Sequence, residues 1–305
     1  MSSVAGTSLP STPRPTGRAR TWAFVKHHLL NVYGLLALGY LVLPVGVVIA
    51  FSFNDPVGKF NYTWKGFTLD NWSNPFGAPG IGDAVAKSLE IAAIVTVVAT
   101  ALGTLVAIAL VRYRFRGGGI TNFLIFLPMS APEIVLGSSL LTLFLNLSVQ
   151  LGFWTIVLAH IMFCISFVVV TVKARLVGFD RHVEEAAMDL YAKPFQTFRL
   201  VTLPLIAPGI LAGAFLAFAL SIDDFVITFF NAGTEQTFPL FVWGAARVGV
   251  PPQVNVIGSA IFLIAVGLMV GNILVQRRRE RSEGFTVGVE AATEAVETGL
   301  AGSRR

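Results

Sequence analysis

Six long apolar segments set the strongest limit on how this chain can fold. They cover residues 30–53, 84–112, 120–146, 152–172, 205–230 and 254–275. A helix needs about 20 consecutive apolar residues to cross the hydrocarbon core of a bilayer, and backbone groups that lie in lipid must be satisfied within their own segment. Charged residues make up only 13% of the chain, whereas soluble domains contain about a quarter. The sequence therefore predicts an all-α polytopic membrane protein with six transmembrane helices.

Basic residues are distributed unevenly between the loops. They lie before the first segment and after the second, fourth and sixth, at Arg14, Arg18, Arg20, Lys26, Arg112, Arg114, Arg116, Lys173, Arg175, Arg181, Lys193, Arg199, Arg277, Arg278, Arg279 and Arg281. The other loops hold few. Because loops on the cytoplasmic side carry the excess of Lys and Arg, we expect both termini to be cytoplasmic. The net charge of +5 then needs no nucleic-acid partner.

The boundaries of the membrane domain follow from composition. We expect a disordered cytoplasmic leader over residues 1–28, a membrane domain over 29–281 and a disordered cytoplasmic tail over 282–305. The loop of residues 54–83 is rich in aromatic residues, which either anchor in the headgroup zone or dock an external protein. The sequence contains no phosphate-binding loop, zinc-protease or serine-hydrolase motif, and its histidines are scattered. We expect no catalytic residue, metal site or cofactor in this chain, so energy must come from a partner or from an ion.

One charged segment interrupts the apolar second half of the chain, at about residues 180–192. Asp180 can cap a helix, apolar residues follow at helical spacing, and the Lys193-Pro194 pair ends it. The apolar stripe is thin because two of its members are alanines, Ala186 and Ala187. An acidic helix is repelled by an anionic cytoplasmic leaflet, so a fit into a protein groove is favoured over one that lies on lipid.

The spacing of this segment resembles the coupling loop of bacterial ABC importer permeases. Glu185-Ala186-Ala187 is followed, at the family's distance, by Leu203-Pro204 with Val201 two residues earlier. The resemblance implies that the helix docks in a cleft of a cytoplasmic ATPase. The docking residues it implies are Glu184, Glu185, Ala186, Ala187, Asp189, Leu190, Tyr191 and Pro204. Tyr191 stands where the family has glycine, so either Tyr191 adopts a positive φ or the turn is made at residues 192–194.

Further stretches, among them "SAPEIVLGSSLL" and "FALSIDDFVITFF", are similar to the second permease subunit of spermidine/putrescine importers. This implies a type I ABC importer permease fold in a bacterial inner membrane, with no enzymatic activity of its own. It also implies three partners, namely a second homologous permease, an ATPase dimer that binds ATP and Mg²⁺, and an extracytoplasmic substrate-binding protein.

Four acidic residues fall inside the apolar segments: Glu90, Glu133, Asp223 and Asp224. Charged groups within a membrane are costly and usually face a bundle interior or an aqueous route. No Lys or Arg lies in the interior of a segment, so we predict that these carboxylates line the route of a cationic substrate. Glu90 can instead reach the outer headgroups, and the Asp pair can form hydrogen bonds at a subunit interface. Helix geometry leaves room for only one of the two aspartates on the route.

Two other functions fit the same pattern. A permease of the same kind can carry a different solute, such as iron, thiamine or another small cation. A secondary carrier, driven by an ion gradient, would need no ATPase at all.

Overall fold

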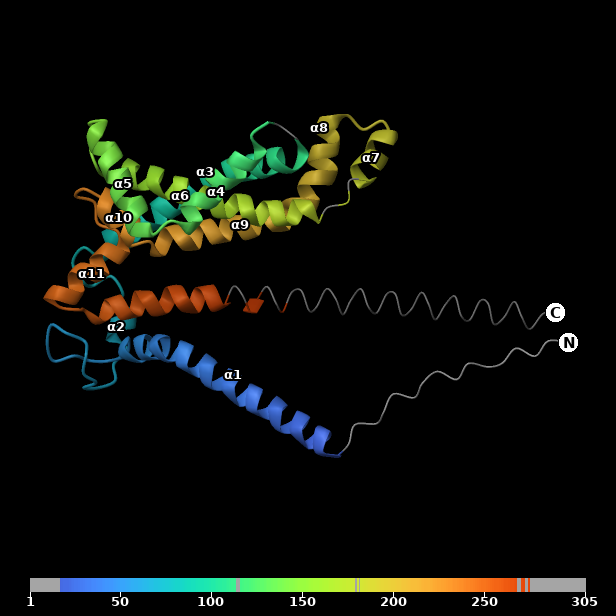
Figure 1. Ribbon diagram of the computed structural model, residues 1–305. Coiled ribbons are helices and arrows are strands. Elements are labelled where there is room, and N and C mark those ends of the chain that lie inside the picture. The colour runs from blue at the N-terminus through green and yellow to red at the C-terminus, as the bar shows by residue number, and fades with distance from the viewer. Residues whose placement is uncertain are drawn as a thin grey trace, which may run out of the picture. The chain divides into compact units, whose positions relative to one another are not determined.

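The computed structural model describes residues 17–113, 116–178, 180, 182–267, 270–271 and 274 (Figure 1). The predicted tail lies outside these residues. The chain forms two compact units. The first contains Trp64–Trp72 together with the described parts of Met1–Asp55 and Asn255–Arg305, and the second contains Pro56–Thr63 and Ser73–Val254.

Within the described residues every regular element is a helix, apart from one isolated bridge between Asn54 and Phe67. The all-α prediction is confirmed. The elements in chain order are α1 (Gly17–Phe51), α2 (Asp70–Ser73), α3 (Ile81–Arg112), α4 (Gly118–Ser130), α5 (Glu133–Asn146), α6 (Phe153–Val177), α7 (His182–Asp189), α8 (Pro194–Thr197), η1 (Phe198–Thr202), α9 (Leu203–Asp223), α10 (Val226–Asn231) and α11 (Phe238–Val248), followed by a helix over Pro252–Gly267.

The first unit is built around α1. This helix begins at Gly17, so it reaches into the leader that the sequence predicted to be disordered up to residue 28. Extending an existing helix adds one hydrogen bond for each residue fixed, which accounts for the extra turns. After α1, the Phe53 ring stacks on Phe67 and on Trp72, with 5.5 Å between ring centroids in both pairs. These contacts order part of the aromatic loop, whose two predicted uses stay predictions.

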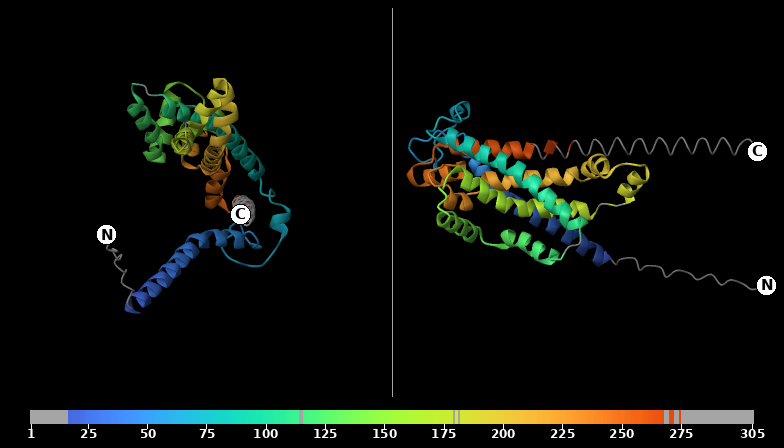
Figure 2. Two further views of the ribbon diagram at one scale, coloured as in Figure 1. Left: turned by 90° about the vertical axis from the view of Figure 1, so that its right-hand side faces the viewer. Right: turned by 90° about the horizontal axis from the view of Figure 1, so that it is seen from above.

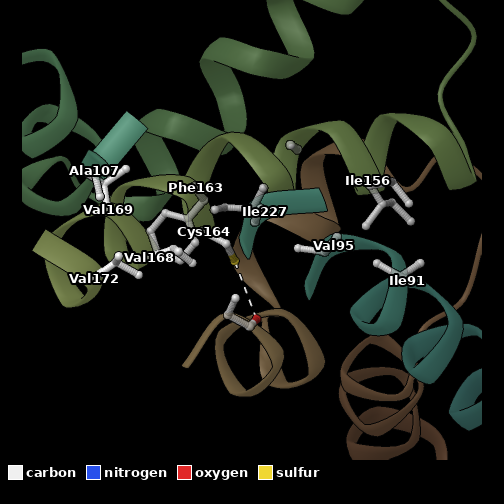
Figure 3. Close-up of a cluster of buried hydrophobic side chains, with 14 of the residues drawn as sticks. Ile91, Val95, Ala107, Ile156, Phe163, Cys164, Val168, Val169, Val172 and Ile227 are labelled. Carbon is white, nitrogen blue, oxygen red and sulfur yellow. Dashed lines mark hydrogen bonds between the residues drawn. The ribbon is translucent and has the colours of Figure 1, made fainter. Parts of the chain in front are cut away.

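The core of the second unit lies where α3, α6 and α9 pack together (Figures 2 and 3). Val168 of α6 stands between two glycines. A Cβ built on Gly103 of α3 would meet the Val168 side chain at 2.7 Å, and one on Gly213 of α9 would meet it at 3.3 Å. Small residues allow helix backbones in a membrane to approach closely. Gly103 and Gly213 therefore bring the two outer helices onto the central one.

Two of the predicted continuous spans are broken. The predicted span 120–146 consists of α4 and α5, which meet at an angle of 107°. The predicted span 205–230 ends at Asp223, because Asp224 is extended with ψ of 121°, and α10 starts at Val226. Pro132 explains the first break, since proline has no N–H to donate and disfavours the helical conformation of the residue before it. The second break is held by side chains that are described below.

Within the part of the chain that the structure describes, four helices are long and apolar enough to cross a membrane, namely Leu29–Phe51, Ile81–Arg112, Phe153–Val177 and Pro194–Asp223. The bent pair α4–α5 makes a fifth if it counts as one span. The sixth predicted segment starts within the shorter apolar helix Pro252–Gly267 and continues into residues that are only partly described. This arrangement is compatible with six spans.

Candidate functional site

The charged segment forms helix α7, which lies at the end of the second unit opposite to α10 and α11 (Figure 1). Its start is held by Asp180. One carboxylate oxygen of Asp180 accepts hydrogen bonds from the backbone N–H of His182, at 3.0 Å, and from its Nδ1, at 2.6 Å. The hydrogen bonds from the His182 backbone and side chain lower the pKa of Asp180, and the bond to Asp180 raises the pKa of His182.

These shifts give the start of α7 a pH dependence. The raised pKa of His182 means that its contribution to stability is fully present below its ordinary pKa of 6.5 and is lost as the pH rises through the raised value. The lowered pKa of Asp180 means that its contribution is present above the ordinary 3.8 and is lost as the pH falls through the lowered value. The pair is therefore complete between pH 3.8 and 6.5.

The far end of α7 is closed by a Schellman motif centred on Tyr191. The N–H of Ala192 bonds to the carbonyl of Ala187 at 3.1 Å, and the N–H of Tyr191 bonds to that of Met188 at 2.9 Å. Tyr191 has φ of +63°, a conformation that glycine adopts most readily at this position of the motif. Of the two turns that the sequence allowed, the structure has the one in which tyrosine takes a positive φ.

Replacing Tyr191 with glycine is expected to stabilise the turn after α7. A left-handed conformation costs an L-residue about 1–2 kcal/mol, part of which is offset by the larger backbone entropy that glycine loses. The expected result is slower hydrogen exchange at the amides of residues 187–192, by about 3-fold to 10-fold, as follows from about 1.4 kcal/mol for each factor of ten. Exchange that is unchanged or faster would show that Tyr191 makes a compensating contact.

Most of the predicted docking residues face outward in the isolated chain. Leu190 is 82% exposed and Tyr191 is 95% exposed. Glu185, Ala186 and Asp189 are exposed, Ala187 is half-buried, and Pro204 on α9 is exposed. Two large apolar side chains at the tip of an acidic helix form a surface that a partner protein can cover.

Glu184 does not share this exposure. Its side chain is only 12% exposed, because the carboxylate accepts hydrogen bonds from Arg112 at the end of α3 and from the Thr202 hydroxyl in η1. The resemblance implied that Glu184 is one of the residues that dock on the ATPase. In the structure it is bound within the chain, and the Arg112–Glu184–Thr202 cluster ties α7 to two transmembrane helices.

Thr202 belongs to a turn that the sequence did not predict. The helix that contains it is continuous from Pro194 to Asp223, with a π-helical turn at Phe198–Thr202. In it the N–H of Leu203 bonds to the carbonyl of Phe198. Pro204 supplies no N–H for the next bond, which accounts for the wider turn there.

The two adjacent aspartates are in different environments. Asp223 is exposed at the end of α9. The Asp224 side chain is 5% exposed and lies 3.2 Å from Nε2 of His160 on α6, whose own side chain is 2% exposed. Asp224 also accepts hydrogen bonds from the backbone N–H of Thr228, at 2.7 Å, and from its hydroxyl, at 2.9 Å. Asp224 therefore has partners within the chain, whereas Asp223 is exposed.

Glu133 and Glu90 are both exposed. Glu133 is the first residue of α5, directly after the break, and Glu90 lies on α3. Beyond the break, α5 packs against α10. A Cβ on Gly137 would lie 2.8 Å from the Phe230 ring, and Nδ2 of Asn231 donates to the carbonyl of Gly137 at 3.3 Å. α5 and α10, the helices that follow the two breaks, therefore stabilise each other by direct contact.

Four side chains of these clusters were missed at the sequence level: His160, Thr228, Arg112 and Thr202. An acidic residue in a span without nearby Lys or Arg calls for another partner, and a histidine within a span, here His160, can supply one. Among the described residues there is no group of three or more His, Cys, Asp or Glu side chains that could hold a metal ion.

Comparison with known proteins gives consistent matches. Residues 99–281 match the family described as binding-protein-dependent transport system inner membrane component. The spermidine/putrescine transport system permease protein PotC of Shigella flexneri is 39% identical over 249 residues, which cover 81% of this chain and 94% of that protein. The putrescine transport system permease protein PotI of Escherichia coli K12 is 39% identical over 244 residues, covering 77% of this chain and 85% of that protein.

A solved structure supports the fold. The crystal structure of a bacterial ABC transporter involved in the import of the acidic polysaccharide alginate aligns with 87% of this chain and 99% of that chain. The TM-score is 0.59 and the sequence identity is 17%. At this identity the match concerns the architecture alone.

Proposed function

This chain belongs to the family of binding-protein-dependent transport system inner membrane components, and from that premise we propose that it is the permease subunit of an ATP-driven importer of polyamines such as spermidine and putrescine. The observation that carries the choice of substrate is the 39% identity to a spermidine/putrescine permease over four-fifths of the chain. The chemistry of the second unit agrees, because its exposed carboxylate Asp223 suits a cationic solute.

In this proposal, α7 couples the permease to a separate ATPase that hydrolyses ATP with Mg²⁺. Support comes from the exposed tip formed by Leu190 and Tyr191 and from the acidic side chains of Glu185 and Asp189 beside it. Apolar anchors surrounded by charged residues are typical of protein interfaces. When the ATPase dimer closes, movement of α7 reaches α3 and α9 through the Arg112–Glu184–Thr202 cluster. Coupling of this kind requires a bundle with two alternative states.

The proposal includes two further partners and an orientation. A second, homologous permease completes the route, and an extracytoplasmic binding protein delivers the solute. Both termini lie in the cytoplasm, on the same side as α7. Support for this orientation comes from the basic residues that flank the α7 end of the second unit, such as Arg112, Lys173 and Arg199.

Uptake in proteoliposomes tests this function. The chain is purified together with its ATPase, second permease and binding protein, reconstituted, and supplied with ATP and labelled spermidine, putrescine, thiamine or ferric ion. Uptake of a polyamine that requires ATP hydrolysis is the expected result. Uptake of thiamine or iron without uptake of either polyamine would show that the substrate is not a polyamine. Uptake driven by an ion gradient without the ATPase would show that transport does not depend on ATP hydrolysis.

Asp223→Asn is expected to weaken polyamine uptake through the Michaelis constant. Loss of one charge opposite a cation removes a charge-assisted contact, worth about 1.5–3 kcal/mol, so KM should rise by about 10-fold or more, at about 1.4 kcal/mol for each factor of ten. Stimulation of the ATPase by the permease should persist, because α7 lies at the other end of the unit. A change in KM of less than about 2-fold is a free-energy difference smaller than about RT. Such a result would show that Asp223 does not lie on the substrate route.

A further inference from the structure

Four buried polar side chains surround the break between α9 and α10. Nδ1 of His160 lies 2.9 Å from the Ser221 hydroxyl, and its Nε2 lies 2.9 Å from the Thr228 hydroxyl and 3.2 Å from Asp224. Asp224 in turn accepts both hydrogen bonds from Thr228. We refer to His160, Ser221, Asp224 and Thr228 as the His160 cluster.

The His160 cluster joins the two sides of the break to a third helix. Ser221 precedes the break on α9, Asp224 forms it, and Thr228 follows it on α10. His160 comes from α6. Of the four long apolar helices among the described residues, α6 is the most buried. An imidazole has one nitrogen on each side of its ring. One side chain of α6 therefore holds α9 and α10 at once.

We propose that His160 is a positioning residue: it fixes the bend between α9 and α10 and thereby keeps Asp223 exposed for the cationic solute. This inference deepens the proposed function and rests on it. Asp223 is the last residue of α9, so the direction of its side chain depends on where the helix stops. The His160 cluster determines that point, because Asp224 is held by Thr228 and His160 and cannot continue the helix.

The His160 cluster also provides the Asp224 carboxylate with polar partners inside the protein. Three polar groups lie against the Asp224 carboxylate: the N–H and the hydroxyl of Thr228, which both donate hydrogen bonds to it, and Nε2 of His160 at 3.2 Å. A buried carboxylate that loses one of these partners has a strong reason to find another. Without His160, Asp224 would compete with Asp223 for a passing cation or would leave its position at the break.

Consequences extend to the neighbouring broken span. Asn231 at the end of α10 donates to the carbonyl of Gly137 in α5, and Ile227 of α10 also lies against Gly137. A change in the direction of α10 therefore displaces α5, which starts with the exposed Glu133.

A double-mutant cycle tests the positioning role. His160→Ala, Asp224→Ala and the double variant are compared in the reconstituted importer by ATP-dependent uptake of labelled spermidine. We expect each single variant to lower uptake at least about 30-fold, and the double variant to be within about 3-fold of the worse single one, because residues in one network are not additive. His160→Gln, which retains a donor and an acceptor, should recover about a third or more of the wild-type rate.

A matched control lies one helical turn away. Cys164 of α6 is buried and its Sγ faces the Ala217 carbonyl of α9 at 3.7 Å (Figure 3). Cys164→Ala also removes a small buried group between α6 and α9, but it does not touch the break. It should leave uptake within about 2-fold of wild type, as expected for a site outside the network. Equal losses for Cys164→Ala and His160→Ala would show that His160 acts only through general packing.

Hydrogen exchange separates failure of this inference from failure of the proposed substrate. In purified protein in lipid nanodiscs, His160→Ala should speed exchange of the amides of Val226–Asn231 at least about 10-fold, while Cys164→Ala should not. If the wild type takes up no polyamine, the proposed function fails and this measurement still decides the positioning role. Unchanged exchange, or multiplicative effects of His160→Ala and Asp224→Ala on uptake, would overturn it. If His160→Ala does not fold, His160→Leu, which occupies the site without a hydrogen-bonding group, and Asp224→Asn replace the alanine variants.

Discussion

Glu185→Arg is expected to separate this permease from its ATPase. Glu185 is exposed on α7 beside the apolar tip of Leu190 and Tyr191, so a partner that covers the tip must also accommodate the side chain at position 185. Reversing a charge that is matched across an interface costs several kcal/mol, which corresponds to a loss of affinity of about 100-fold or more. The ATPase should no longer copurify with the variant, and ATP-dependent uptake should be lost.

A control for this substitution is Asp83→Arg. Asp83 is also exposed, and it lies in the first turn of α3, whereas the last residue of that helix, Arg112, contacts α7. The exchange changes the net charge by the same amount at the opposite end of the helix. Copurification should be retained in Asp83→Arg. If Glu185→Arg keeps the ATPase bound and still transports, α7 is not the docking element. If the variant loses the ATPase and still transports, a carrier driven by an ion gradient becomes the better explanation.

Helix content and the position of α7 could be predicted from the sequence because both depend on local patterns. The apolar segments are long enough to cross a bilayer as helices, and Asp180 and Lys193-Pro194 mark where a helix begins and ends. The two breaks were harder to predict. Pro132 was a visible signal for the first, but nothing adjacent in the sequence shows that Asp224 leaves the helix, because its partner His160 is 64 positions away.

The roles of the acidic residues were predicted less well for the same reason. Sequence alone gave Glu184 and Glu185 the same docking role, and it placed only one of Asp223 and Asp224 on the route without identifying which one. Tertiary contacts separate each pair, since one member is bound within the chain and the other is exposed. Neighbouring residues on a helix point about 100° apart, so a run of two acidic residues at the edge of a packed helix commonly has one on each side.

Exchanging the charges of Arg112 and Glu184 is expected to show whether their contact transmits the movement of α7 to α3 or instead contributes to binding of the ATPase. Arg112→Glu places two carboxylates together at the end of α3, where the Glu184 side chain is only 12% exposed. Truncating or reversing one member of such a pair costs about 2–5 kcal/mol. Uptake should fall by about 30-fold or more, at about 1.4 kcal/mol for each factor of ten. The ATPase should remain bound, because Glu185, Leu190 and Tyr191 are unchanged.

The combined variant Arg112→Glu/Glu184→Arg restores opposite charges at the same two positions, and Thr202 can hydrogen-bond to either partner. Uptake per ATP hydrolysed should therefore recover to at least about a third of the wild-type value, a difference of less than about 1 kcal/mol, although neither residue is native. Arg116→Glu, a charge reversal at an exposed residue just after α3, provides the comparison and should transport normally. If the exchange shows no recovery while the ATPase stays bound, the Arg112–Glu184 contact holds α7 in place without carrying its motion, and the force must reach α9 through the continuous helix from Pro194 instead.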